Sequence, residues 1–310
     1  MNTTDDFLAG LGSPEVSALK LTGDISLENR SYTVDRDLEI DLNGHSMTAT
    51  YGSPLFQANG GKLTIKGNGT ISNKGNVGIA SNGGEIIVEN GILTSSNQAV
   101  FRAGEGGTVT VNGGSLTGQE GAVDSNNPNG TIVINDGHLT GLDNYAIATN
   151  GSSGRGGNVI TINGGTLEGN IRSAGYEAIG VYLPNNDTFV MNGGEIIAHG
   201  GTGICMRAGD VTINGGTITA TNVDKDGNTV ADGWIGDKKT VMTGCSAIIY
   251  HESANYPGKA GMKLTVNGGT ITGVDHSIQV LSNEITPQVF VTGGVLTPAY
   301  PEPEETQTEP

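Results

Sequence analysis

One pattern of apolar and polar positions recurs along most of this 310-residue chain. Two apolar residues that alternate with a polar one are followed by Asn-Gly-Gly and a further apolar residue, as in residues 109–116, 160–167 and 264–271. Alternation with a period of two is typical of a strand with one buried face, and Gly-rich corners between short apolar runs indicate tight turns. The pattern therefore predicts an all-β repeat protein.

The anchor position that this Asn occupies recurs every 22 to 29 residues, except for one interval of 53 residues between Asn214 and Asn267. A weaker apolar centre lies between successive anchors, and the long interval holds one such centre, at Ile248. Stacked coils pack on their neighbours alone, so one domain of this kind can exceed the usual length. We predict a single right-handed, three-faced parallel β-helix of about ten coils over residues 21–297, with an insertion at 221–243.

The anchor position itself carries a second expectation. A sharp corner between two strands needs a residue that accepts positive φ, which Gly and Asn do at low cost. Side chains stacked at strand spacing can also hydrogen-bond from coil to coil as a ladder, so Asn is explained either by the ladder or by the turn alone. Asn stands at seven of the ten anchors, namely Asn43, Asn112, Asn135, Asn163, Asn192, Asn214 and Asn267.

Side chains two residues before the anchor should point outward, because the residue next to the anchor belongs to an apolar, inward column. Four of these outward residues are Thr, but four others are apolar: Ile87, Val133, Val190 and Phe290. Outward apolar residues along one wall suggest a lateral contact between copies. We expect a homo-oligomer, and a trimer by analogy with viral β-helices, among which trimers are common.

Both ends of a solenoid expose a core and strand edges, so each needs a cover. In residues 1–20, Ser13-Pro14 fits a helix N-cap followed by Pro, and Phe7, Leu8, Leu11 and Val16 can form an apolar face. We expect a short helical cap, which could also dock a protein partner. Residues 298–310 hold four Glu and four Pro without a basic residue, which predicts a flexible acidic tail.

The net charge of −17 argues against nucleic acid or an anionic membrane surface as a partner. No apolar run approaches the roughly 20 residues of a membrane helix. The first residues are acidic and lack the apolar core of a signal peptide. We expect a protein that is made in the cytoplasm and is released by lysis.

Candidate metal chemistry is confined to the insertion, where Asp224, Asp226, Asn228 and Asp232 have the spacing of a calcium loop. The Gly and the final Glu of such a loop are missing, and an Asp-Gly turn explains the same residues. Trp234 follows and could serve as a sugar platform or pack on the wall of the solenoid. We assign no metal site and no cofactor.

The two cysteines are too few for a disulfide framework. In the predicted register, Cys205 and Cys245 lie four residues apart along neighbouring strands, or about 13 Å. A disulfide needs Cα atoms within about 7 Å, so both cysteines are expected to be free thiols.

The Asn-Gly-Gly coils, together with residues 21–27 and 38–45, resemble the repeats of the pectate-lyase-like β-helix superfamily over residues 20–297. Such repeats occur in carbohydrate lyases and hydrolases, phage tail spikes, phage head-decoration proteins and bacterial adhesins. The resemblance implies the fold and leaves the activity open. The Asn-Thr-Asp, Gly-His-Gly and Arg-Ile-Lys motifs of the polygalacturonase-like enzymes do not occur in this sequence, so no catalytic residue is assigned.

These observations favour a non-catalytic structural protein of a phage virion, either a capsid decoration or an appendage protein with a virion protein as partner. A tail-spike-type protein that binds or degrades carbohydrate is the alternative, and a surface adhesin is the second alternative.

Overall fold

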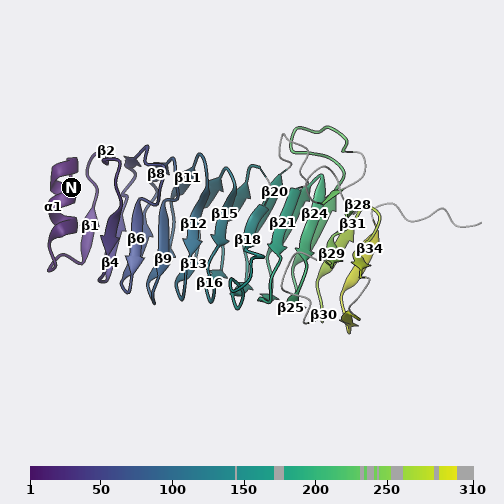
Figure 1. The fold of residues 1–310 in the computed structure, drawn as a ribbon. Coiled ribbons are helices and arrows are strands. Elements are labelled where there is room, and N and C mark those ends of the chain that lie inside the picture. Colours follow the sequence, from purple (N-terminus) through teal and green to yellow (C-terminus); the bar gives the residue numbers. More distant parts are fainter. Residues whose placement is uncertain are drawn as a thin grey trace, which may run out of the picture.

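The computed structural model describes residues 1–143, 145–170, 178–230, 234–235, 241–242, 244–252, 261–282 and 286–298. It shows a parallel β-solenoid of about ten turns, with 52% strand and 3% helix. The all-β prediction is therefore confirmed. The coils stack into a rod, with helix α1 (Thr4–Gly12) at one end and the strands of the last coil at the other (Figure 1).

Three long parallel sheets form the walls of the rod. Each coil contributes one strand to each sheet, in the chain order A, B, C. Sheet A contains β1 (Ala18–Lys20), β4 (Leu38–Asp41), β7 (Lys62–Lys66), β10 (Glu85–Val88), β13 (Thr108–Val111), β16 (Thr131–Ile134), β19 (Val159–Ile162), β22 (Thr188–Met191), β25 (Gly209–Ile213), β30 (Met262–Val266) and β33 (Gln288–Val291).

The other two walls follow the same order. Sheet B contains β2 (Ile25–Ser26), β5 (Ser46–Thr48), β8 (Thr70–Asn73), β11 (Ile92–Ser95), β14 (Ser115–Gly118), β17 (His138–Gly141), β20 (Thr166–Asn170), β23 (Glu195–His199), β26 (Thr217–Thr221), β31 (Thr270–Gly273) and β34 (Val295–Pro298). Sheet C contains β3 (Tyr32–Val34), β6 (Phe56–Asn59), β9 (Gly78–Ser81), β12 (Ala99–Ala103), β15 (Gly121–Ser125), β18 (Tyr145–Thr149), β21 (Ala178–Leu183), β24 (Gly201–Met206), β29 (Ile248–His251) and β32 (Ile278–Leu281).

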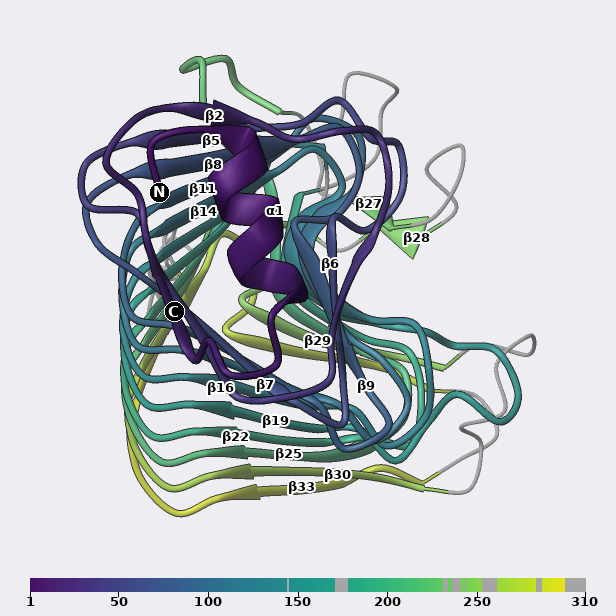
Figure 2. The same ribbon diagram turned by 90° about the vertical axis from the view of Figure 1, so that its left-hand side faces the viewer.

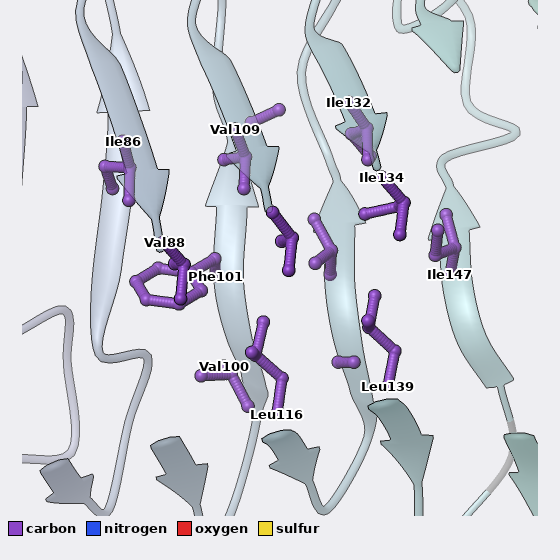
Figure 3. Close-up of a cluster of buried hydrophobic side chains, with 14 of the residues drawn as sticks. Ile86, Val88, Val100, Phe101, Val109, Leu116, Ile132, Ile134, Leu139 and Ile147 are labelled. Atoms are coloured by element: carbon purple, nitrogen blue, oxygen red, sulfur yellow. The ribbon is translucent and has the colours of Figure 1, made fainter. Parts of the chain in front are cut away.

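Alternate residues of the three walls point inward and form one continuous apolar core. Val88 is paired in register with Val111, Leu93 with Leu116, and these four side chains are buried. Figure 3 shows Val88, Leu116 and Phe101, from sheets A, B and C, in the interior between the sheets. Like residues therefore stack on like residues from coil to coil, at the roughly 4.8 Å spacing of paired strands.

The first three coils have longer corners between sheets A and B than the later coils. The register pairs Ile40 with Ile65 and Ile65 with Val88, so Ile40 occupies the inner position that the sequence pattern gives to Leu42. Asn43 then lies two residues beyond the true anchor of its coil, at φ +48°. The prediction that Asn43 belongs to the anchor column is wrong for this reason.

Helix α1 lies across the first coil and covers the open end of the core (Figure 2). Phe7 is fully buried and Leu11 nearly so. The Thr3 side chain caps the helix by accepting from the Asp6 amide, and Ser13 is the C-cap. The helix therefore ends at Ser13-Pro14, where the sequence pattern was interpreted as a helix start. Pro is common just after a helix end because it cannot continue the helix.

A cation from the first coil holds the end of α1 in place. The Arg36 guanidinium donates to the backbone oxygen of Leu11 at 2.8 Å and to that of Val16 at 3.2 Å. These carbonyls lie at and just beyond the helix C-terminus, where a positive charge is also favoured by the helix dipole. The cap is thus tied to the solenoid by polar as well as apolar contacts.

The long interval between anchors is one coil with an inserted segment. Strand β26 pairs directly with β31, and β24 pairs with β29, so the walls continue across the insertion. Within it, β27 (Trp234–Ile235) pairs antiparallel with β28 (Val241–Met242). In the described part of the chain no helix is long and apolar enough to cross a membrane.

Candidate functional site

A chain of side-chain hydrogen bonds runs along the corner between sheets A and B. Each Asn in it donates from its amide nitrogen to the amide oxygen of the Asn one coil earlier, at 2.7–2.9 Å. The first Asn donates to the Glu89 carboxylate at 3.0 Å, and the Thr292 hydroxyl donates to the last Asn at 2.9 Å. The Asn members are Asn112, Asn135, Asn163, Asn192, Asn214 and Asn267. Eight successive coils are joined in this way, beyond their backbone bonds.

Asn43 takes a different partner. Its amide nitrogen donates to the backbone oxygen of Leu21 at 2.9 Å, because its corner is longer than those of the later coils.

Two glycines follow each ladder Asn except Asn135, which Asp136-Gly137 follows, and their positions explain the Asn-Gly-Gly corner. A Cβ at Gly193 would lie 2.7 Å from the backbone oxygen of Asn163. The positive φ of the corner falls on Gly194, at +83°, rather than on Asn192. The first glycine therefore permits close stacking and the second makes the turn. Asn is left to make the side-chain hydrogen bonds.

The four outward apolar residues of sheet A share one column. The register runs from Ile87 through Thr110 to Val133, and onward through Val190 to Phe290. Thr residues separate the apolar ones, and Ile87, Val133 and Val190 are half-buried by their neighbours. Phe290, on the last strand, is 49% exposed. The lateral contact stays a prediction, and its exposed apolar area is greatest at the end of the rod.

The N-terminal residues predicted to dock a partner divide into two groups. Phe7 and Leu11 are buried against the first coil, so they cannot contact a partner while α1 stays in place. Leu8 and Val16 pack on the same core but are partly exposed. The hypothesis that all four residues dock a partner does not fit Phe7 and Leu11, because their side chains already pack against the first coil.

In the insertion, the Asp224 carboxylate closes a tight turn. One of its oxygens accepts from the backbone amides of Asp226 at 2.9 Å and Asn228 at 2.8 Å, and the other accepts from the Asn228 side-chain amide at 3.0 Å. The side-chain bond from Asn228, with the backbone bonds, lowers the pKa of Asp224. Asp226 pairs with Lys225 at 2.7 Å. Among the described residues, no three His, Cys, Asp or Glu side chains converge as metal ligands would. Asp232 lies outside the described residues, as does the side chain of Trp234.

The two cysteines are not joined in a disulfide, as predicted, and both side chains are buried. Cys205 is paired in register with Ile249, four residues beyond Cys245. Its side chain belongs to a small apolar cluster with Ile179 and Ile249, on the outer face of sheet C.

The outer face of sheet C carries charged and aromatic side chains that the repeat pattern does not explain. Arg102 and Asp124 are paired in register on neighbouring strands, and the guanidinium donates two hydrogen bonds to the carboxylate at 2.7 and 2.6 Å. Burial opposes the charge on Arg102, but the bonds to Asp124 outweigh it and raise the guanidinium pKa. Burial and the Asp124 charge raise the pKa of Tyr145 nearby. A bidentate, buried pair of this kind holds two coils in register.

A second polar cluster lies further along the same face. Arg207 donates to Nδ1 of His251 at 2.9 Å, and its guanidinium lies over the Tyr182 ring at 5.7 Å from the centroid. Burial and the Arg207 charge lower the pKa of His251 to about 4. The imidazole is therefore neutral at pH 7, with Nδ1 as the acceptor. Glu252, the next residue, accepts from the Ser282 hydroxyl at 2.8 Å.

The Tyr182 cluster, comprising Tyr182, Arg207, His251 and Glu252, has the chemistry of a polar ligand site. An aromatic ring, a guanidinium, an imidazole and a carboxylate offer stacking, donors and acceptors together. A His of such low pKa does not serve as a general acid near neutral pH. Sequence reasoning missed this cluster because its members come from three coils, each ordinary in its own repeat. The register of the sheet C strands is the signal that would have found it.

A shallow groove lies on the corner between sheets B and C, over the earlier coils. Its volume is about 450 Å³, and its lining is mostly Ser, Thr and amide side chains, including Ser72, Thr94 and Gln119. Gln119 is held by a 2.6 Å hydrogen bond to Asp143. The groove offers hydroxyl and amide groups but no ring for stacking among its lining residues.

One buried carboxylate serves the fold. Asp187 accepts from the Thr149 hydroxyl at 2.6 Å and from both nitrogens of Asn158 at 2.8 and 2.9 Å. Burial raises the pKa of Asp187 even though these donors favour its charge. The network joins the end of β18 to the loops that hold Asn158 and Asp187, so we assign it a structural role.

Comparison of the chain with protein families, with curated proteins and with solved structures gave no match.

Proposed function

We propose that this protein is a non-catalytic structural component of a phage particle, either a capsid decoration protein or an appendage. The uninterrupted stack of coils is the observation that carries the proposal. Apolar columns fill the core, and the Asn ladder joins the coils from Glu89 to Thr292 along one corner. A rod built in this way resists bending and keeps two points at a fixed separation, which is the mechanical task of an appendage.

The resemblance of the coils to phage β-helix repeats supports the same proposal, and the net charge of −17 suits a protein displayed in many copies. On this proposal the protein is made in the host cytoplasm and ends in the virion, with another virion protein as its partner. No nucleic-acid or membrane partner is proposed.

Attachment through the outer surface of α1 is the form of docking that the cap permits. Leu8 and Val16 are partly exposed at the tip, beside a pocket of about 240 Å³ that Leu8 shares with Arg30 and Tyr32. This surface is smaller than the four-residue face expected from the sequence. It can bind a partner without removing Phe7 from the core.

Cosedimentation with the phage particles encoded by the same genome tests the proposal. The intact protein should pellet with the particles, and the double variant Leu8→Asp, Val16→Asp should bind at least tenfold more weakly. Circular dichroism should show that the variant keeps its coils. A matched control, Thr110→Asp, adds a charge to the wall and should bind as the intact protein does. Failure of the intact protein to pellet would overturn the proposal.

A carbohydrate-binding role is the second candidate, and the Tyr182 cluster favours it. Incubation with a panel of acidic and neutral polysaccharides, followed by measurement of new reducing ends and of binding, separates the two candidates. A structural protein should release no ends and bind no glycan. Depolymerisation or binding that is lost in Arg207→Ala would replace the structural proposal with the tail-spike-type one.

A further inference from the structure

The last coil exposes the end of the apolar core. Six of the nine large hydrophobic side chains that are exposed among the described residues belong to β32, β33 and β34: Val280, Val289, Phe290, Val291, Val295 and Leu296. Val289, Val291 and Leu296 continue the inward columns of Leu264, Val266 and Ile271, which are at most 1% exposed one coil earlier. Val289, Val291 and Leu296 therefore form a cross-section through the core, while Phe290 and Val295 point outward on the walls of the same coil.

The same coil leaves three strand edges open. β32, β33 and β34 are the last strands of sheets C, A and B, and in the described chain each has a neighbour on one side alone. Their outer backbone N–H and C=O groups face away from the rod. Such an edge can pair with a strand of another molecule.

The three edge strands themselves carry no ionisable side chain, in a chain whose net charge is −17. Carboxylates do occur nearby in sequence, at Glu284 between β32 and β33 and at the four Glu of the tail. Two copies would repel each other along most approaches, but these three strands can pair without a carboxylate on either strand. The other end of the rod cannot serve as the complement, because α1 covers it (Figure 2). Head-to-tail stacking is thereby excluded.

We propose that the surface formed by β32, β33 and β34 binds the same surface of a second copy of this chain. A contact of a surface with itself has two-fold symmetry and closes at a dimer. The resulting particle is a single longer rod, with an α1 cap at each tip. The proposal concerns assembly and does not depend on the phage assignment.

The geometry of the last coil specifies the pairing. Three consecutive strands share the rise of about 4.8 Å per coil, so β32 should lie about a third of this rise below β33 and β34 about a third above it. A two-fold axis through the middle of β33 places β34 of each copy opposite β32 of the other. The lower position of β32 then offsets the higher position of β34. The spacing between each strand and the opposite strand of the partner is therefore the same in all three sheets.

The alternation of side chains fixes the register. Residues directly opposite each other in an antiparallel pair point to the same face of the sheet. Val289 and Val291 point inward and Phe290 outward, so a centred pairing puts Phe290 opposite Phe290 of the partner. Val289 then lies opposite the partner's Val291, and the two cores join without a break.

A cysteine on the axis tests this pairing. In Phe290→Cys the two Cα atoms should lie about 5 Å apart, within the range of a disulfide. Mild oxidation should convert most of the protein to a covalent dimer on denaturing gels. The matched control is Thr265→Cys, one coil earlier in the same column. Its two Cα atoms should be about 14 Å apart, three strand spacings, and should not cross-link.

Light scattering supplies the second measurement. At micromolar concentration the intact chain should have twice the monomer mass of 31.6 kDa, and Phe290→Lys should have the monomer mass with unchanged circular dichroism. A chain lacking residues 299–310 should remain a dimer. A monomeric intact chain that dimerises only without these residues would show that they cover the end instead. That result, a trimer, or equal cross-linking of both cysteine variants would overturn the proposal.

Discussion

The amide of Asn163 makes two hydrogen bonds that face opposite ways along the rod. Its nitrogen donates to Asn135 at 2.7 Å, and its oxygen accepts from Asn192 at 2.8 Å. Asp has nearly the same shape but cannot donate when ionised. All hydrogen bonds of the ladder therefore point the same way along the rod, from a donor on one coil to an acceptor on the coil before it. Asn can take part because its amide both donates and accepts.

Asn163→Asp should destabilise the protein more than Asn163→Ala, because the carboxylate faces the Asn135 oxygen. We expect a loss of about 1 kcal/mol for Ala, as for one ordinary hydrogen bond, and about 2 kcal/mol for Asp at pH 7. Urea unfolding measures both. Below the usual Asp pKa of about 3.9, the protonated side chain can donate again. The loss of unfolding free energy in Asn163→Asp should therefore be smaller there than at pH 7.

Thr161→Asp is the control for charge alone, because Thr161 lies two residues before Asn163, on β19, and points outward. Equal losses for Asp at positions 161 and 163 would count against the ladder.

His251 should make stability depend on pH. Its folded pKa of about 4 lies below the ordinary value of 6.5, so the unfolded chain binds more protons between these values. Its contribution to stability is complete above about pH 6.5 and is lost as pH falls toward 4. Because solvent reaches part of the ring, we expect about 1–2 kcal/mol.

His251→Gln, which keeps an acceptor for Arg207, should flatten the stability profile between pH 6.5 and 4. The charged groups acting on the ring are Arg207 and Glu252. Denaturant unfolding at a series of pH values, compared with the intact protein, gives the difference. An identical slope in both proteins would show that His251 is not the group that titrates.

Among the elements, α1 is the one with a separable role. Phe7→Ala removes a fully buried ring and should cost the first coils about 3 kcal/mol, within the range for such truncations. Each coil contacts its neighbours alone, so the effect should be local. Hydrogen exchange should speed up in β1 and β4 and stay unchanged beyond β10.

The matched variant for this prediction is Leu8→Ala, on the partly exposed side of the same helix, which should cost less than about 1 kcal/mol. Uniformly faster exchange along the whole rod would contradict the local account.

The strands were predictable from the sequence and the ends were not, for physical reasons. Columns such as Val111 and Leu116 follow the period of two, which the pleat imposes directly. The position of α1 depends on Thr3 as N-cap and on Arg36, which reaches the helix from another coil. No local pattern signals that contact, so Pro14 was interpreted as a start. The longer corner at Asn43 breaks the spacing that made the later coils readable.

The candidate site, too, was predictable from the sequence only in part. The ladder follows from one position repeated in sequence, whereas Tyr182, Arg207 and His251 meet only through the register of sheet C. Their spacing depends on the lengths of the loops between strands, which the repeat does not determine.

For the whole molecule, the three walls, the cap and the open last coil form a rod with one end covered by α1 and with one end that, on our proposal, binds a second copy. Sheet A has 11 strands, so ten spacings of about 4.8 Å and a helix about 10 Å thick give a monomer about 60 Å long.

Electron microscopy of the purified chain at micromolar concentration measures this length most directly. The account predicts single rods about 120 Å long, one coil wide throughout. Rods of about 60 Å, or bundles of three rods side by side, would contradict it.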